Sequence, residues 1–347
     1  MHMADALINP AVGGTMWIVT AGLIAWCARK VKQTMNDKLV PMMGVLGAFI
    51  FAAMMINFSI PVTGSSGHLG GGLILTILLG PYAAFLVISS VLVVQAFFFA
   101  DGGLLALGCN IFNLGFFPAF IAYPFIYRVI ARDEHGTLRA WIAAIVAAVV
   151  GLQLGAFGVV LETKASGISE LPFSAFVLLM QPIHLAIGIV EGLATAAVVT
   201  FVARARPEAL FPEQAAVESR NSMRPVLIGL LIATVIVGGA ASWFASTHPD
   251  GLEWTIAKVS GKEEIAGKED GVHAKLSQLQ EKTAFLPDYS FKSSENDSAS
   301  EEKAETKAEP WPVVSTGTSV SGIVGGLITL VLAGLIGFTL KARRMGV

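Results

Sequence analysis

The chain has 347 residues, of which 54% are hydrophobic and 14% are charged. An ordinary soluble domain carries about 25% charged residues, so the long apolar runs predict a membrane protein that crosses the bilayer several times. The formal net charge of −2 says nothing about nucleic acid. The sequence has no concentrated basic patch, so we expect no nucleic-acid partner, and the lipid bilayer is the first expected partner. The sequence contains no P-loop motif for ATP, and Cys27 and Cys109 form no CxxC or disulfide pattern.

Nine apolar segments are predicted to form membrane-spanning helices. They cover about residues 11–27, 40–57, 69–79, 81–99, 104–127, 140–161, 174–202, 223–245 and 319–340. The segment 69–79 is too short to cross the bilayer upright, and it could instead form one kinked helix with the segment that follows it. We keep the two apart at Gly80-Pro81, because a helix tends to end just before a proline.

The positions of the arginines predict the orientation of the chain. With nine spans and the N-terminus outside, every arginine lies on the inner side, and the short outer loops hold only Lys164. Because inner loops of membrane proteins are enriched in Lys and Arg, we expect a multi-pass membrane protein whose N-terminus is outside and whose C-terminus is inside. Merging the segments 69–79 and 81–99 into one span would move residues 128–139, with three arginines, to the outside.

The order of these segments predicts an all-α polytopic membrane protein in two units. Residues 1–203 would form a bundle of seven spans, and residues 204–222 a polar inner linker. In residues 223–347, two further spans would flank a long outer segment. The stretch 293–309 within that segment is acidic and low in complexity, so we expect it to be disordered.

The first two residues, Met1 and His2, carry the most specific chemistry in the sequence. A free terminal amine, the deprotonated backbone nitrogen of His2 and its ring Nδ1 lie at chelating distance from one another. The three nitrogens lie in one plane, and square-planar nitrogen coordination suits Ni(II) or Cu(II). For the dipeptide alone, the commoner alternative is that His2 is simply the second residue of the chain.

A fourth nitrogen is available from His68, in the predicted outer loop 57–72. The glycines around it let the backbone fold tightly and approach other backbone closely. A lone histidine in such a loop is more often a solvated side chain. Because His68 is expected on the same side of the membrane as the amine-histidine terminus, we predict that it completes the square.

Four separated motifs resemble the CbiM/NikM family, the substrate-binding subunits of cobalt and nickel energy-coupling-factor (ECF) transporters. The motifs are residues 1–7, 66–69, 100–113 and 184–191, and they occur in the family's order over about residues 1–203. The stretch 248–253 resembles the two-span PDGLE (CbiN/NikN) partner subunit, so the chain looks like a fused M–N protein. The resemblance implies a metal held by the amine of Met1, the backbone and ring nitrogens of His2, and the ring of His68. This chain has Ala4 where many relatives have proline.

Other polar residues are candidates for supporting this site. Asp101, in a glycine-rich outer turn, either anchors the loops around the metal or simply forms the turn. Asn110 and Asn113 lie within a predicted span, where polar groups usually hydrogen-bond across helices. His184 and Glu191 are seven residues apart and share one helix face, and we favour a structural network over direct metal contact for both.

Ala48 and Ala52 form a small-xxx-small pattern, which permits close helix packing. In the family that these motifs resemble, such a pattern faces the transmembrane coupling subunit. Packing inside the chain is the equally weighted alternative.

Together these features predict a substrate-specific membrane component that captures Ni(II), with Co(II) as the alternative substrate. The protein would not be an enzyme, because the resemblance implies that a transmembrane coupling (T) subunit and separate ABC-type ATPase subunits complete the transporter. Nickel is favoured by the square of nitrogens and by the affinity order of divalent metals. A metal sensor without transport is a rival function. An intramembrane enzyme is another, although no HExxH motif or Ser/His/Asp set supports it.

Overall fold

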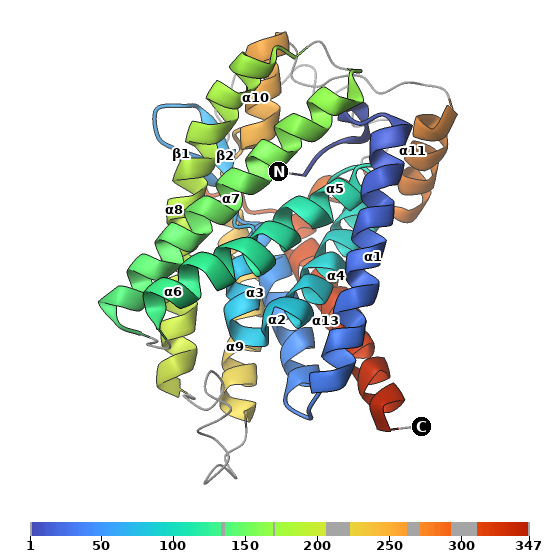
Figure 1. Cartoon of the computed structure of the whole chain (residues 1–347). Helices are drawn as coiled ribbons and strands as arrows, with labels where there is room; N and C mark the ends of the chain where they lie inside the picture. Colours follow the sequence, from blue (N-terminus) through green and yellow to red (C-terminus); the bar gives the residue numbers. More distant parts are fainter. Residues whose placement is uncertain are drawn as a thin grey trace.

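The structure, a computed structural model, describes residues 2–132, 136–168, 171–205, 223–261, 271–292 and 311–345. Its helices pack side by side into one bundle (Figure 1), with the N-terminal arm at one end and the C-terminus at the opposite end. Among the described residues, six helices are long and apolar enough to cross a membrane. They are α1 (Pro10–Thr34), α4 (Pro81–Phe99), the continuous helix formed by α5 (Leu107–Ile111), η2 (Phe112–Tyr127) and α6 (Arg128–Ala131), α7 (Leu138–Ser166), α8 (Phe173–Ala205) and α13 (Thr316–Met345).

Three further apolar helices are shorter. They are α2 (Leu39–Met54), α3 (Gly72–Leu79) and α9 (Arg224–Gly239). Helix α3 has 8 residues, so it is about 12 Å long, well under the ~30 Å of a hydrocarbon core. The sequence predicts nine membrane-spanning helices, seven plus two. Among the described residues, six helices have membrane-crossing length, so the predicted count is not confirmed. The predicted break at Gly80-Pro81 is present: Gly80 has φ 79° and ends α3, and Pro81 begins α4.

Small elements cover the end of the bundle that carries the N-terminal arm. Strands β1 (Phe58–Ile60) and β2 (Ser65–Gly67) form an antiparallel hairpin, which the all-α prediction did not include. The C-terminal part of the chain adds α10 (Gly251–Ser260) and α11 (Gly271–Thr283). The short turns are η1 (Asp5–Leu7), η5 (Ala241–Phe244) and η6 (Pro287–Tyr289). The stretch 293–309, predicted to be disordered, and most of the linker 204–222 lie outside the described residues.

Ala48 and Ala52 lie inside the molecule, where α2 packs against α9 and α13. Their exposed fractions are 1% and 0%. A Cβ atom placed on Gly238 of α9 would lie 3.3 Å from Cβ of Ala52, and one on Gly326 of α13 would lie 3.8 Å from the carbonyl oxygen of Ala48. Small residues on all three helices let the backbones approach this closely. The prediction that Ala48 and Ala52 face a coupling subunit is therefore replaced by the alternative, packing within the chain.

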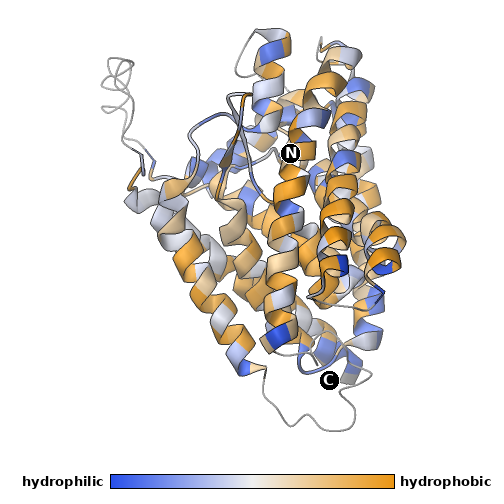
Figure 2. Cartoon of the chain, turned by 90° about the vertical axis from the view of Figure 1, so that its left-hand side faces the viewer, coloured by the Kyte–Doolittle hydropathy of each residue, from blue (hydrophilic) through white to orange (hydrophobic). Residues whose placement is uncertain are grey.

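The surface of the bundle is that of a membrane protein. Hydrophobic residues cover most of the helix length, and hydrophilic residues gather toward the ends (Figure 2). Large apolar side chains are exposed on several long helices, among them Leu178 (70%) and Phe338 (60%). Such a continuous apolar surface fits contact with lipid.

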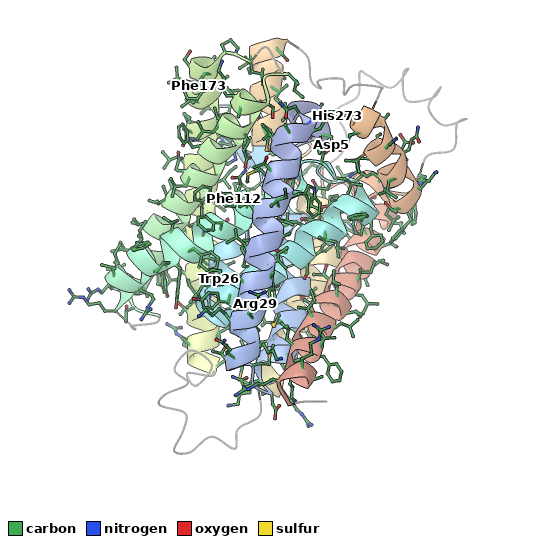
Figure 3. The ribbon with its side chains drawn as sticks, turned by 45° about the vertical axis from the view of Figure 1, so that its right-hand side comes forward. Asp5, Trp26, Arg29, Phe112, Phe173 and His273 are labelled. Atoms are coloured by element: carbon green, nitrogen blue, oxygen red, sulfur yellow. The ribbon has the colours of Figure 1, made fainter. Side chains whose placement is uncertain are left out.

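The end of the bundle opposite the arm is basic. The last turns of α1 and α13 lie together there and present Arg29, Lys32, Arg343 and Arg344 around one surface pocket. Arg344 also donates a hydrogen bond to the carbonyl oxygen of Met35. Asp5 and His273 lie at one end of α1, and Arg29 lies toward the other (Figure 3). The two ends of the bundle therefore differ in chemistry, and the candidate site belongs to the end that carries the arm.

Candidate metal centre

The N-terminal arm is held as an extended chain against the turn between α4 and α5. Met1 lies outside the described residues, and the description begins at His2. The backbone nitrogen of Met3 donates to Oδ1 of Asn110 at 2.8 Å, and Nδ2 of Asn110 donates to the carbonyl oxygen of Met3 at 3.3 Å. The nitrogen of Gly103 also donates to that oxygen, at 2.9 Å. The amide of Asn110 thus pairs with the backbone as a neighbouring strand would.

The arm is fixed further along by Asp5 and by a helix of the C-terminal part. Oδ1 of Asp5 accepts hydrogen bonds from the nitrogens of Leu105 at 2.8 Å and Ala106 at 3.0 Å. A Cβ on Gly103 would lie 1.9 Å from the same oxygen, so this position requires glycine. The Nε2 atom of His273 in α11 lies 2.8 Å from the carbonyl oxygen of Ile8. These contacts hold the arm in a defined place relative to the bundle.

The backbone of the loop that carries His68 is hydrogen-bonded to Glu191 of α8. Oε2 of Glu191 accepts a hydrogen bond from the nitrogen of Gly70 at 2.6 Å. A Cβ on Gly72 would lie 2.4 Å from the carbonyl oxygen of Leu114, so only glycine allows this approach. Nδ1 of His68 lies 3.0 Å from the carbonyl oxygen of Leu69. If Nδ1 donates to that oxygen, Nε2 of His68 keeps its lone pair for another partner.

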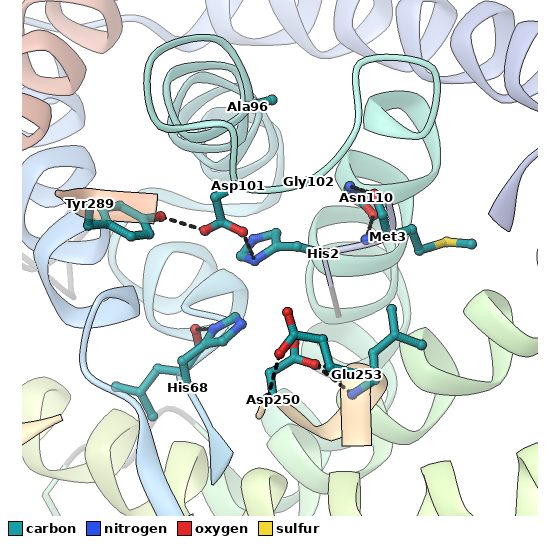
Figure 4. A network of polar contacts seen from close by, with 12 residues as sticks. His2, Met3, His68, Ala96, Asp101, Gly102, Asn110, Asp250, Glu253 and Tyr289 are labelled. Atoms are coloured by element: carbon teal, nitrogen blue, oxygen red, sulfur yellow. Dashed lines mark hydrogen bonds and ion pairs between the residues drawn. The ribbon is translucent and has the colours of Figure 1, made fainter. Parts of the chain in front are cut away.

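The rings of His2 and His68 lie face to face at the centre of this region (Figure 4). Their centroids are 4.9 Å apart and their planes differ by 7°. Nδ1 of His2 lies 3.1 Å from Oδ1 of Asp101. Its Nε2 is buried and has no hydrogen-bond partner among the described residues. The predicted residues His2, His68 and Asp101 are thus brought together from three separate stretches of the chain.

Side chains alone do not supply a full set of metal ligands. No group of three or more His, Cys, Asp or Glu side chains in the described part of the chain could hold a metal ion. The two imidazoles of His2 and His68 therefore leave coordination positions that other kinds of donor would have to fill. Backbone nitrogen and a terminal amine are donors of that kind.

The charges around the two rings are set by burial and by hydrogen bonding. Burial, followed by the neighbouring His2, lowers the pKa of His68 to about 4, so this ring is neutral near pH 7. Burial alone would raise the pKa of Asp101, but the His2 ring and the Tyr289 hydroxyl hold it below its ordinary value. The site therefore combines an imidazole that is free to bind a metal with an ionised carboxylate.

The PDGLE stretch, residues 249–253, is bound directly to the hairpin that precedes His68. The backbone nitrogen of Ser66 donates to the carbonyl oxygen of Pro249 at 2.8 Å. The Ser66 hydroxyl donates to the carbonyl oxygen of His248, also at 2.8 Å. Ser66 and Asp250 form a parallel bridge, so the PDGLE stretch extends the hairpin as a third strand would. The strand that leads to His68 is therefore completed by a distant part of the chain.

The residues of the PDGLE motif each have a local physical role. Oδ1 of Asp250 caps α10 by accepting hydrogen bonds from the nitrogens of Leu252 at 2.7 Å and Glu253 at 2.8 Å. In turn, Oε2 of Glu253 accepts a hydrogen bond from the nitrogen of Asp250 at 3.0 Å, which completes a capping box. A Cβ on Gly251 would lie 2.5 Å from the side chain of Ile183, so glycine lets α10 begin directly on α8.

A small cavity of about 10 Å³ lies beside His68, between the loop, α8 and the start of α10. It has room for roughly one water-sized particle. His184 lines it together with His68 and Asp250, and Nδ1 of His184 lies 2.8 Å from the carbonyl oxygen of Met180. Asn113 is not among the residues that line the cavity, and its Nδ2 donates to Oε2 of Glu162 in α7 at 2.7 Å.

Sequence reasoning did not select several residues that take part in this site. They are Asp5, Asp250, Glu253, His273 and Tyr289. Asp5, Asp250 and Glu253 lie inside stretches that already resembled known motifs, so a local signal existed for them. His273 and Tyr289 lie in no such stretch, and their positions follow from packing alone.

Two known families match this chain. Residues 2–209 match CbiM, described as the cobalt uptake substrate-specific transmembrane region, and residues 224–342 match the PDGLE domain. The fused nickel transport protein NikMN of Rhodobacter capsulatus is 31% identical over 312 residues, which cover 83% of this chain and 88% of that protein. The cobalt transport protein CbiM of Geobacter sulfurreducens is 26% identical over 276 residues, which cover 74% and 77%.

The fold is also similar to a solved structure. The crystal structure of a transition metal transporter superposes with a TM-score of 0.54 at 28% sequence identity. The match covers 62% of this chain and 98% of the other.

Proposed function

The chain belongs to the CbiM family of cobalt-uptake transmembrane proteins and carries a C-terminal PDGLE domain, and we propose that it captures Ni(II) from outside for ATP-driven uptake. One observation supports this most strongly. The rings of His2 and His68 lie 4.9 Å apart at the end of an arm whose backbone is tied down at Met3 and Asp5. Such fixed donors at the start of the chain suit a metal that takes nitrogen ligands.

The proposed ligand set completes the two imidazoles with backbone donors. The amine of Met1, the backbone nitrogen and Nδ1 of His2, and Nε2 of His68 would form the square. The His2 nitrogen donates no hydrogen bond to any described residue, whereas the next nitrogen, that of Met3, is bound to Asn110. The arm therefore leaves free the backbone nitrogen that the square requires.

The position of Asp101 defines what coordination through Nδ1 would involve. Nδ1 of His2 lies 3.1 Å from Asp101, so binding at this atom exchanges the carboxylate contact for the metal. In the alternative, His2 binds through its ring alone, by Nε2, and Asp101 orients the ring from behind. The two arrangements differ in whether a free amine at Met1 is needed, and a one-residue extension separates them.

Nickel is the substrate that the proposed donors favour. Planar nitrogen ligands suit Ni(II), and the affinity order places it above Co(II). Relatives of this chain include both a nickel transport protein and a cobalt transport protein, so Co(II) is the alternative substrate. A membrane-bound metal sensor that does not transport is the alternative function.

The proposal also covers partners and orientation. A transmembrane coupling subunit and ABC-type ATPase subunits would supply the energy, with residues 1–203 as the metal-binding unit, 204–222 as the linker and 223–347 as the PDGLE unit. The basic end formed by Arg29, Lys32, Arg343 and Arg344 lies opposite the site. The tendency of basic residues to stay inside supports an arm and site that face outward, with the C-terminus inside.

Metal content and uptake together test the proposed function. The intact protein is purified from cells supplied with equal nickel and cobalt, and its bound metal is measured by elemental mass spectrometry. Uptake of labelled nickel is then compared in cells with and without the coupling and ATPase subunits. We expect one bound nickel per chain and uptake that depends on those subunits. Bound nickel without any uptake would favour the sensor, and bound cobalt would reassign the substrate.

A further inference from the structure

The outer segment 271–292 reaches back over the turn that holds Asp101. Nε2 of Gln280 donates to the carbonyl oxygens of Ala96 at 2.9 Å and Gly102 at 2.8 Å, so it bridges the end of α4 and the turn. The nitrogen of Leu286 donates to the carbonyl oxygen of Phe98 at 3.3 Å. A segment from the C-terminal part of the chain is thereby fixed beside the candidate metal centre.

Tyr289 lies near the end of this segment, in a backbone conformation that residues other than glycine rarely adopt. Its φ is 57°, and that of Asp288 before it is 49°. Two successive non-glycine residues in the left-handed region store strain that the surrounding contacts must offset. The ring of Tyr289 stacks on Phe99 with centroids 5.1 Å apart, and its hydroxyl donates to Oδ2 of Asp101 at 2.5 Å. The strained turn directs this hydroxyl at Asp101.

Both oxygens of the Asp101 carboxylate are therefore engaged. Oδ2 accepts from Tyr289, and Oδ1 faces the ring of His2 at 3.1 Å. A carboxylate beside a bound divalent cation is otherwise a ready ligand, and oxygen donors suit Mg(II), Ca(II) or Mn(II) rather than a planar nickel site. Burial and the neighbouring Asp101 raise the pKa of Tyr289 well above its ordinary value, so its hydroxyl keeps the proton that it donates.

We infer that Tyr289 is a positioning residue for metal selectivity: when the metal takes the place of Asp101 at Nδ1 of His2, the Tyr289 hydroxyl holds Oδ2 of the displaced carboxylate and keeps it out of the coordination sphere. This inference rests on the proposed function. It gives the PDGLE domain a part in choosing the metal, through one hydroxyl and one carboxylate. Without the hydroxyl, Oδ2 is released and Asp101 can turn toward the cation.

The test compares Tyr289→Phe with wild type in the full-length, purified protein. The phenylalanine keeps the stacking on Phe99 and removes only the hydroxyl. Loss of a hydrogen bond to a charged group typically changes an affinity by about tenfold. We therefore expect Ni(II) affinity by calorimetry to fall about tenfold relative to Mn(II), with weakening of the planar Ni(II) absorption. Tyr82→Phe is the matched control, because the Tyr82 ring packs edge-to-face against Trp26 and its hydroxyl makes no hydrogen bond to the described residues. This variant should match wild type.

A second comparison shows whether Tyr289 acts through Asp101. In an Asp101→Asn background, adding Tyr289→Phe should change neither the nickel-to-manganese ratio nor the spectrum, because an amide is a poor replacement for the carboxylate ligand. Further loss of about tenfold in the double variant would overturn the inference, as would a Tyr289→Phe protein with the ratio and spectrum of wild type. Wild-type protein that binds no nickel would instead overturn the proposed function itself.

Discussion

The two histidine-bearing segments of the candidate site are held in different ways. His68 follows a hairpin, and backbone atoms beside it are held by Glu191 at Gly70 and by Pro249 at Ser66. Its ring Nδ1 lies against a carbonyl oxygen of its own loop, that of Leu69. The ring of His2, by contrast, is itself contacted at Nδ1 by Asp101. Changes around His68 should therefore move a donor, whereas changes around His2 should alter which atoms are available to bind.

The C-terminal part of the chain contributes to both arrangements. It supplies the third strand beside the hairpin through Pro249 and the hydroxyl above Asp101 through Tyr289. A histidine from each of two stretches of the CbiM region is thus supported by a different stretch of the PDGLE domain. The PDGLE domain therefore contacts the candidate site at two points, and each contact can be perturbed separately.

The largest effect is expected from His68→Ala. Removing this ring takes away one of the four proposed nitrogens, and we expect tight nickel binding to fall by at least about 100-fold, measured by calorimetry. His248→Ala is the matched control, because the side chain of His248 is exposed and the residue contacts the hairpin through its backbone carbonyl oxygen. Nickel binding by His68→Ala at the wild-type level would remove His68 from the site.

An added residue before Met1 should have a comparable effect through the other histidine. The extension converts the primary amine into an amide, which is a poor donor, and leaves His2 intact. We expect loss of tight binding and of the planar Ni(II) absorption, with the terminus verified by mass spectrometry. Near-normal binding and an unchanged spectrum would instead support coordination by the His2 ring alone.

Glu191→Ala tests the anchor below His68 and should have an intermediate effect. The change leaves the buried nitrogen of Gly70 without its acceptor, at a cost of about 1–3 kcal/mol. If the loop moves as a result, nickel affinity falls by roughly 10- to 100-fold. Glu191→Gln keeps an acceptor oxygen and should recover most of the affinity. Equal loss in both variants would mean that the charge of Glu191 matters rather than its hydrogen bond.

The smallest effects separate two parts of the outer segment. Replacing residues 248–251 removes the partners of Ser66 and the cap of α10, so we expect uptake of labelled nickel to fall severalfold. Deleting residues 293–309, an acidic stretch that cannot build a core, should leave uptake near wild type. Equal uptake by the two variants would show that the strand beside the hairpin has no part in loading the site.

The local properties of the sequence were sufficient to predict the class of protein, and they also define the proposed nitrogen donors, which stay a prediction. Low charge over long apolar runs predicts membrane helices because that pattern involves only consecutive residues, and six helices of spanning length agree with it. The break at Gly80-Pro81 follows from backbone preferences at two residues, and the structure confirms it. The amine, amide and ring nitrogens of Met1-His2 are close because they are covalently linked.

Packing between distant segments was decided only by the tertiary structure. The pattern at Ala48 and Ala52 predicts close packing but not its partner, and α9 and α13, far along the chain, occupy that face. The stacking of His2 on His68 joins residues from separate segments. Tyr289 belongs to no motif, and a strained turn and a stacked phenylalanine bring it to Asp101. Such contacts depend on how whole elements pack, because short-range sequence patterns carry no information about which distant surface will meet them.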